Sequence, residues 1–400
     1  MISLTQAHQH INMLSPLPPV IVPLEKALGL ICAVELRAAT SCPTVDSSLK
    51  DGFAVLSTDI ANATVHNPVT LTVAGALTAG DDVDKLCVQS GTAIRIMTGA
   101  SIPSGATAVL ASEFTRGINA EQVIATADAA EGRNILRKGS DIVQDQIVAH
   151  KGDLLSPAHL GLLAAAGLNE VLCYPVPKVA VVATGSELVL PGEPVTVGKV
   201  AASNMVTAAA ELQRLGVHAS TILIRDNLEQ LQAQFKQLVQ QVDVLITCGG
   251  VLDGDKDLTM RAMEQIGMEK IFHRVRIGPG KGACMGRVGD TVVFNLPGGP
   301  PSNHVALLLL ALPGVRKLMG FSDPLPPKNK VIMAEEFNGQ KNWTQLIYSG
   351  VKQEQGSFVT VPADDMSRFE AMAEADILIE IPEGCTGIGK AALAGAWFVK

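Results

Sequence analysis

The sequence predicts a multidomain α/β protein, with a doubly wound α/β domain in its second half and β-rich domains around it. Three observations carry this prediction. The 400 residues exceed what one hydrophobic core usually serves, and a hydrophobic share of 47% is enough to fill several cores. Strand-like and helix-like segments alternate from 176 to 322. Outside that span, short β-rich runs separated by Gly, Pro and Asp prevail.

The N-terminal part combines two patterns. Residues 1–44 show short helical patterns, among them the apolar periodicity of 24–38, interrupted by Pro-rich breaks. A further helix is expected at 157–166, with Ser156 as its N-cap. We expect 1–44 and 140–175 to form a connecting layer. Between them, the runs 69–73, 93–97 and 108–110 predict a small β domain over 45–139.

The span 176–322 is interpreted as an open α/β sheet. Residues 179–182 are a continuous apolar run, as expected of a parallel strand covered on both faces. Repeated strand-helix-strand order implies a right-handed parallel sheet. Ser203 or Asn204, and Asp226 together with Glu229, are the expected N-terminal caps of two helices. Further strands are expected at 220–224, 242–247 and 292–294, and a last helix from Ser302.

The tail, 323–400, returns to short strand-like segments. They lie at 330–333, 358–361 and 377–380. This pattern predicts a separate, small, β-barrel-like domain.

Charge and cysteine usage exclude several classes of function. A net charge of -8 argues against a general surface for nucleic acid or acidic membranes. The longest apolar run, 305–312, is far shorter than the roughly 20 residues of a bilayer span, and the N-terminus lacks a signal-like pattern. The 7 cysteines are widely spaced without a Cys-x-x-Cys pair, which predicts reduced thiols. We therefore expect a soluble, cytoplasmic protein without nucleic-acid or membrane partners.

Three Gly-rich loops follow predicted strands of the α/β span. In an open α/β sheet, ligands bind beyond the carboxyl ends of the strands. The loop 249–257 combines glycines with carboxylates, and the loop 278–282 sets a lysine among glycines. The loop 296–301 leads into a helix N-terminus, which favours anions. Each loop alone is more typical of a plain turn, but three at one predicted sheet edge favour a ligand site.

Several ordered motifs resemble those of one family. The segment 48–54 reads Ser-Leu-Lys-Asp-Gly-Phe-Ala, and 95–100 reads Arg-Ile-Met-Thr-Gly-Ala. Both resemble motifs of the MoeA and gephyrin E-domain family, the molybdopterin molybdenumtransferases. The resemblance extends over nearly all of the chain up to about 322 and is carried further by 134–142, 184–188, 203–204, 225–226, 249–257 and 296–300.

The resemblance implies a fold and an activity. It implies an elongated homodimer whose subunit has four domains, with a doubly wound, MogA-like α/β domain that binds molybdopterin. The reaction implied is the insertion of molybdate into adenylylated molybdopterin, with release of AMP and with Mg²⁺ present. The site would lie between the Asp-Gly motif domain of one subunit and the α/β domain of the other. A molybdoenzyme or other proteins of the cofactor pathway are further expected partners. The implied domains are 1–44 with 140–175, 45–139, 176–322 and 323–400.

The same resemblance assigns site residues by motif. A metal-dependent, molybdate-handling cluster is expected from Asp51, Thr98, Asp141, Glu187, Asp226 and Asp257. Asp51, Glu187, Asp226 and Asp257 are the expected metal ligands, because magnesium prefers carboxylates. Each of these residues also has a purely structural interpretation, as a turn, a helix cap or a solvated charge. The residues expected to hold the pterin and its anionic groups are Gly249, Gly250, Gly254, Arg276, Lys281, Pro297, Gly298, Pro300 and Ser302.

Departures from the family pattern fall at the ligand loops. Gly278 stands where the family usually has the first of two lysines, and Gly299 stands where it has an asparagine. Leu252 replaces a serine, and Lys50 replaces a methionine beside Asp51. Arg276 and Lys256 are the candidate replacement cations. Three hypotheses follow: a molybdenumtransferase, a paralogue that binds and delivers molybdopterin or the finished cofactor, and an interaction scaffold that uses an exposed apolar groove.

Overall fold

The chain divides into two compact units. The computed structural model describes residues 1–400 except 118, 120, 252–256, 355 and 362–365. The larger unit comprises Met1–Val20, Gly29–Ala33 and Leu172–Lys400, and the smaller one comprises Ile21–Leu28 and Val34–Val171. Within the part of the chain that the structure describes, no helix has the length and apolar character needed to span a bilayer.

The smaller unit is built around a six-stranded sheet with the order β8-β5-β7-β6-β10-β9. Its buried strand β5 (Gly52–Val55) runs antiparallel to both neighbours and directly follows Asp51. Gly52 is required there, because a Cβ would stand 2.0 Å from the Leu110 carbonyl oxygen. The other strands are β6 (Val69–Leu77), β7 (Thr92–Ile96), β8 (Ala108–Ala111), β9 (Thr115–Arg116) and β10 (Gln122–Ala125).

The connecting segments differ in part from the expectation. Helix α2 (Pro157–Ala165) is capped by Ser156 as predicted. The prediction of a helix over 24–38 is wrong. Only the 3₁₀ turn η1 (Leu24–Lys26) forms, and Gly29 then turns the chain at φ +76°. Short strands follow, namely β2 (Ile31–Cys32), which pairs with β13 (Glu170–Tyr174), and β3 (Leu36–Arg37), which pairs with β12 (Ile147–Ala149).

The first 20 residues lie in the larger unit. Helix α1 (Leu4–Asn12) packs on the helical segment of 307–318, and His8 Nε2 donates to the Leu309 carbonyl at 3.0 Å. The sequence analysis assigned all of 1–44 to a connecting layer, but 1–20 pack within the larger unit. The four domain boundaries stay a prediction.

The larger unit contains the doubly wound sheet, ordered β17-β14-β18-β22-β21-β19. The first four strands are parallel, as predicted. Strand β21 runs antiparallel to β22, and β19 runs antiparallel to β21, so the prediction of a fully parallel sheet is wrong. The physical reason is the tight connection between β21 and β22, where Val288 pairs with Thr291 and leaves no room for a crossover helix. The bounds are β14 (Val179–Thr184), β17 (Ser220–Ile224), β18 (Val244–Cys248), β19 (Glu269–His273), β21 (Cys284–Val288) and β22 (Thr291–Leu296).

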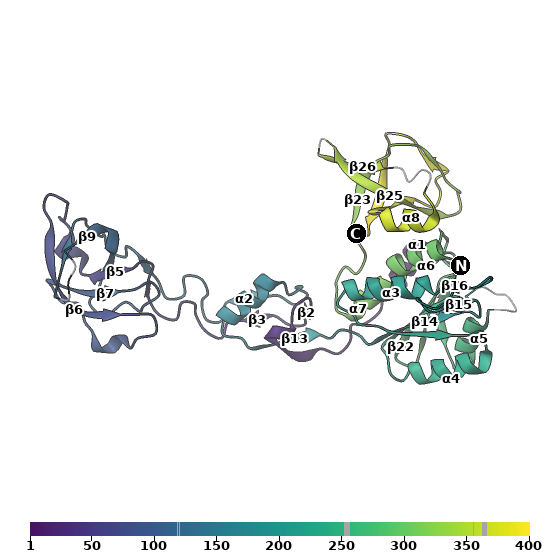
Figure 1. The fold of residues 1–400 in the computed structure, drawn as a ribbon, viewed down its shortest axis with the longest axis horizontal. Helices are drawn as coiled ribbons and strands as arrows, with labels where there is room; N and C mark the ends of the chain where they lie inside the picture. The colour runs from purple at the N-terminus through teal and green to yellow at the C-terminus, as the bar shows by residue number, and fades with distance from the viewer. Residues whose placement is uncertain (118, 120, 252–256, 355, 362–365) are drawn as a thin grey trace. The chain divides into compact units, whose positions relative to one another are not determined.

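Helices cover both faces of this sheet (Figure 1). Strand β14 shows why: Val179, Val181 and Ala183 enter one hydrophobic core, while Ala180 and Val182 enter the other. The first core includes residues of α3 (Ser203–Arg214), α6 (Pro300–Ala306), the π-helical turn η5 (Leu307–Ala311) and α7 (Leu312–Leu318). The second includes residues of α4 (Leu228–Leu238) and α5 (Leu258–Gln265).

The expected helix starts are wrong in three places. The N-cap of α3 is Ala202, without a side-chain capping bond, rather than Ser203 or Asn204. The N-cap of α4 is Asn227, whose side chain accepts the N–H of Gln230, so Asp226 is released from a capping role. The last helix starts at Pro300, before the expected Ser302.

The C-terminal segment forms a closed sheet, in line with the predicted barrel-like domain. Its order is β20-β25-β26-β23-β29-β27, and a further pairing of β25 with β27 closes it. The strand β20 (Ile277–Gly278) does not come from the tail but from the Gly-rich loop of the α/β span. The tail supplies β23 (Lys328–Ile332), β25 (Thr344–Glu354), β26 (Ser357–Val361), β27 (Ile377–Ile381), β29 (Leu393–Phe398) and the helix α8 (Arg368–Glu374).

Candidate functional site

A cavity of about 700 Å³ lies at the carboxyl ends of β14 and β18, where the sheet topology predicts a ligand. We call it the strand-end cavity. Three of the predicted acids line it, together with four of the predicted ligand-loop residues. Its lining includes Glu187, Lys199, Asn204, Asp226, Gly249, Gly250, Asp257, Gly298, Pro300, Arg368 and Phe369.

The two glycines after β18 are required by packing. Gly249 has φ +115°, and a Cβ there would stand 2.7 Å from the Thr184 carbonyl oxygen. Gly250 has φ +63°, and its Cβ would stand 2.5 Å from Thr259 Oγ1. Thr184 and Thr259 are themselves buried and joined by a hydroxyl hydrogen bond of 2.9 Å. The Gly-Gly pair therefore lets the loop close against β14 and α5, whatever the ligand.

Asp226 and Glu187 are held by the turn that follows β14. Asp226 Oδ2 accepts the N–H of Ser186 at 3.0 Å, and the Asp226 N–H donates to Ser186 Oγ at 3.2 Å. Both carboxylate oxygens of Glu187 lie 2.7 Å from where a Cβ on Gly185 would stand, so glycine at 185 leaves room for that side chain. Asp257 is the N-cap of α5, but its side chain makes no capping bond.

The acids share a cavity but do not by themselves form a cation site. Among the side chains that the structure describes, no three of His, Cys, Asp and Glu gather closely enough to hold a metal ion. Of the remaining predicted residues here, Gly254 lies outside the described residues, as do Leu252 and Lys256.

Sequence reasoning missed the cations of this cavity. Lys199 Nζ donates to the Ser186 carbonyl at 2.6 Å, on the same turn that holds Asp226. Lys199 precedes β16 (Val200–Ala201), which pairs with β15 (Leu188–Val189) and thereby returns the chain to the cavity. Arg368 and Phe369 come from α8 of the tail. No motif marked any of the three, although the quoted pair 203–204 lies close to Lys199 in sequence.

A second cavity, of about 670 Å³, adjoins the first, because Gly250, Asp257 and Gly298 line both. We call it the Lys281 cavity. Its walls come from the Gly-rich loop of 277–282, the loop of 297–299 and the start of the C-terminal sheet. Predicted residues in its lining are Lys281, Pro297, Gly298 and Ser302, and unpredicted ones are Gln340, Trp343 and Gln345.

Arg276 lies outside both linings. Its Nε donates to Glu383 Oε1 at 2.8 Å, and its Nη1 donates to the Met1 carbonyl at 3.4 Å. Lys281 is thus the one Lys or Arg among the described residues that line the second cavity.

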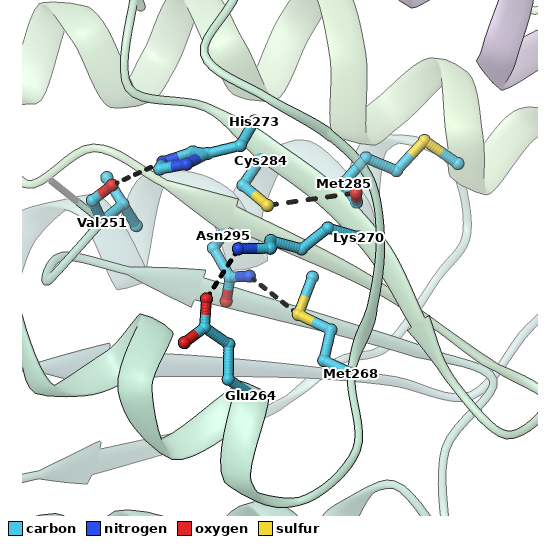
Figure 2. Close-up of polar contacts among 8 residues, drawn as sticks. All are labelled: Val251, Glu264, Met268, Lys270, His273, Cys284, Met285 and Asn295. Atoms are coloured by element: carbon cyan, nitrogen blue, oxygen red, sulfur yellow. Dashed lines mark hydrogen bonds and ion pairs between the residues drawn. The ribbon is translucent and has the colours of Figure 1, made fainter. Parts of the chain in front are cut away.

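Polar side chains of β19 and β22 make separate contacts beside Val251, the residue that follows Gly250 (Figure 2). His273 Nε2, on the edge strand β19, donates to the Val251 carbonyl at 3.0 Å. Asn295, fully buried on β22, donates to Met268 Sδ at 3.6 Å and accepts from the Thr247 hydroxyl at 2.8 Å. His273 therefore joins the edge strand β19 to the backbone at Val251, next to Gly250.

The other predicted residues lie in the smaller unit. Asp51 Oδ1 accepts the N–H of Thr98 at 2.7 Å and its hydroxyl at 2.8 Å, so the two motifs meet. These bonds, the backbone N–H first, lower the pKa of Asp51 below its usual value and keep the carboxylate ionised. Asp141 lies in an exposed turn, where its N–H donates to the Cys42 carbonyl at 3.1 Å.

Comparison with known proteins agrees with this architecture. Residues 2–167 match the family described as the MoeA N-terminal region (domain I and II). Residues 180–317 match a probable molybdopterin binding domain. A crystal structure of a molybdopterin biosynthesis MoeA protein from Pyrococcus horikosii superposes with a TM-score of 0.83 at 28% identity, covering 100% of this chain and 99% of that one.

Full-length relatives point the same way. The molybdopterin molybdenumtransferase 2 of Mycobacterium tuberculosis is 33% identical in an alignment of 402 positions that covers 98% of each chain. The molybdopterin molybdenumtransferase of Staphylococcus aureus is 31% identical over 381 residues, 94% of this chain and 90% of that protein. From the ordered motifs, the strand-end acids and these matches, the chain belongs to the MoeA family, the molybdopterin molybdenumtransferases.

Proposed function

We propose that this protein acts in molybdenum cofactor biosynthesis by inserting molybdate into adenylylated molybdopterin with release of AMP. One observation carries the proposal. Two adjoining cavities share Gly250, Asp257 and Gly298; Glu187, Asp226 and Lys199 line only the first, and Lys281 lines only the second. A substrate with a phosphorylated, extended body and a separate small oxyanion needs such a pair of adjoining cavities.

In this proposal the strand-end cavity takes the pterin nucleotide. The Lys199 ammonium faces the phosphates, while the Asn204 amide, which donates to the Gly298 carbonyl at 2.8 Å, joins the first turn of α3 to the loop after β22. The Lys281 cavity takes molybdate, with Lys281 opposing its double negative charge.

Magnesium fits this donor set only together with a substrate. Glu187, Asp226 and Asp257 line one cavity, and Mg²⁺ is commonly bound by one or two carboxylates, with waters and substrate phosphates as its other ligands. When bound, the ion would neutralise phosphate charge during release of AMP. The chain's own part is to hold Asp226 against the Ser186 turn, so that its free oxygen faces the cavity.

The test is molybdate-dependent release of AMP from adenylylated molybdopterin by the purified full-length chain. We expect turnover that is lost when EDTA is added and restored by Mg²⁺. Asp226→Asn keeps the shape of the side chain and should abolish turnover while the fold persists. Wild-type protein that binds the pterin nucleotide but releases no AMP would contradict the proposal.

That contradicting outcome would favour the second candidate, a paralogue that delivers molybdopterin or finished cofactor to a molybdoenzyme. The observation that favours it is Gly278, which leaves Lys281 as the one Lys or Arg in the described lining of its cavity. Retained pterin binding without turnover, followed by transfer to an apo-molybdoenzyme, identifies the carrier.

Two further proposals concern the oligomeric state and the predicted residues of the smaller unit. We propose that the chain forms a homodimer, which light scattering on the purified protein tests. We also propose that Asp51, Thr98 and Asp141 take part in the reaction, supported by their motifs and by the two hydrogen bonds that Thr98 donates to the Asp51 carboxylate. Asp51→Asn, which keeps an oxygen that can accept from Thr98, should lower turnover with little change in the thermal midpoint.

A further inference from the structure

The Lys281 side chain has an unusual neighbour that belongs to the tail. Its Nζ lies 5.1 Å from the centroid of the Trp343 ring, inside the range of a cation–π contact. Both side chains line the same cavity. The resemblance to the family does not extend by motif to the tail, so the sequence pattern assigned Trp343 no role.

The backbone explains why the ring lies there. Trp343 directly precedes β25, whose first residues pair with β20 in the register Ile277 to Thr344 and Gly278 to Gln345. The Thr344 N–H donates to the Arg276 carbonyl at 3.0 Å, and the Trp343 N–H donates to the Gln340 carbonyl at 3.0 Å. The loop that carries Lys281 and the turn that carries Trp343 are therefore tied together by a strand ladder.

The aromatic neighbour restricts the conformations of the Lys281 side chain. Lys281 is exposed, and its long side chain would otherwise sample many rotamers. The Trp343 indole is half-buried, and it offers its electron-rich face to the ammonium without neutralising the charge, as a carboxylate would. The charge thus stays available to an anion in the cavity.

We propose that Trp343 is a positioning residue, which holds Lys281 in the orientation that binds the oxyanion substrate. The inference rests on the proposed function, because it takes molybdate as the ligand of the Lys281 cavity. The C-terminal sheet is then part of the binding site and not only an appendage to the α/β domain.

The probe is sodium molybdate alone, titrated calorimetrically into the full-length protein without pterin. We expect Lys281→Ala to weaken binding by about 10-fold or more and Trp343→Leu by about 2- to 5-fold. Trp343→Phe should recover part of the loss, because a phenyl ring keeps a weaker cation–π face. Lys341→Ala is the matched control, since this exposed lysine in the same turn does not line the cavity.

A double-mutant cycle separates positioning from direct contact. If Trp343 acts through Lys281, the double variant binds no more weakly than Lys281→Ala alone. Additive losses would overturn the inference and show that the indole contacts a ligand itself. Normal molybdate affinity in Trp343→Leu would also overturn it, and the proposed function would stand. If the wild-type protein binds no molybdate, the proposal that Lys281 binds the oxyanion is overturned. The assay of AMP release tests the proposed reaction separately.

The fluorescence emission of Trp343 provides a further test, because a purely structural role predicts no change on addition of molybdate. The chain has 2 tryptophans, so Trp397→Phe leaves Trp343 as the only indole. Molybdate should change its emission in step with the calorimetric titration, and Lys281→Ala should remove the change. An emission that molybdate leaves unaltered, in protein that binds molybdate, contradicts the positioning role.

Discussion

The two adjoining cavities are built in opposite ways. The strand-end cavity is defined mainly by turns that follow parallel strands, and its acids come from motifs within one domain. The Lys281 cavity is shared between two sheets, because β20 leaves the α/β span to pair with β25 of the tail. The difference teaches that motifs identify residues at strand ends, whereas a wall formed by tertiary strand pairing has no local sequence signal.

The largest expected effect is on turnover, at the strand-end cavity. Asp226→Ala should reduce molybdate-dependent AMP release by about 100-fold or more, the magnitude seen when one group that stabilises transition-state charge is removed. Its thermal midpoint should change little, because Asp226 is exposed and caps no helix. Glu229→Gln, an exposed acid in the first turn of α4, is the control and should leave the rate unchanged. Equal losses in both variants would contradict a specific role.

Acid should loosen the junction with the tail. His304 on α6 is buried and stacks on Tyr348 of β25, with Nδ1 and the Tyr348 hydroxyl 3.0 Å apart. Burial lowers the pKa of His304 from 6.5 to about 4. Between pH 6.5 and pH 4, His304 is protonated in the unfolded chain and neutral in the folded chain. The free energy of unfolding therefore falls as the pH drops from 6.5 to 4. The expected loss is about 3 kcal/mol.

Urea denaturation at several pH values measures this slope. His304→Phe keeps a ring against Tyr348 and should flatten the dependence. His8, also buried, has its pKa lowered by burial and contributes in the same direction, so some slope remains. A slope that His304→Phe does not reduce would show that His304 is hydrated or already charged in the folded chain.

The glycines at the shared wall provide a stability test. Gly250→Ala should cost about 2 kcal/mol, because its φ of +63° is unfavourable for alanine and the new methyl would press on Thr259 Oγ1 at 2.5 Å. Gly289→Ala is close in φ, at +58°, but no atom lies within 4 Å of its Cβ. Chemical denaturation should show a smaller loss for the control. Equal losses would mean that the contact with Thr259 relaxes freely.

The smallest effect concerns the thiol in the strand-end cavity. Cys248 is buried at the end of β18, and burial raises its pKa to about 12, so it is neither nucleophile nor ligand at neutral pH. At pH 8, a thiol reagent should modify the exposed Cys87 and Cys385 rapidly and leave Cys248 unmodified in the native protein. Cys248→Ala should cost about 1 kcal/mol or less and keep turnover. Rapid labelling of Cys248, located by mass spectrometry, would contradict this.

Much of the α/β fold could be predicted, for a physical reason. Strands β14 and β18 are almost entirely apolar and fully buried, as expected of parallel strands covered on both faces, and β17 and β22 each contain a shorter apolar run. The antiparallel strands β19 and β21 were missed, because mixed burial gives them no clean alternation. Caps failed where two candidates stand side by side: Asn227, and not Asp226, accepts the helix N–H.

For the site, motifs predicted the acids and Lys281, but not Lys199 or Arg368. Glu187, Asp226 and Asp257 do line one cavity, and Asp51 meets Thr98 within the smaller unit. Lys199 reaches the site only through the pairing of β15 with β16, and Trp343 only through β20 with β25. Pairings between segments far apart in sequence depend on the folded context, which no window along the chain contains.

The two-residue strand β20 joins the tail to the loop that carries Lys281. Because Ile277 and Gly278 are bonded into the C-terminal sheet while Gly282 and Ala283 are buried in the α/β domain, the intervening stretch is clamped at both ends. Deleting the tail to obtain a minimal α/β fragment would therefore leave 277–278 without a strand partner, and exchanging tails between relatives would exchange part of the wall of the Lys281 cavity.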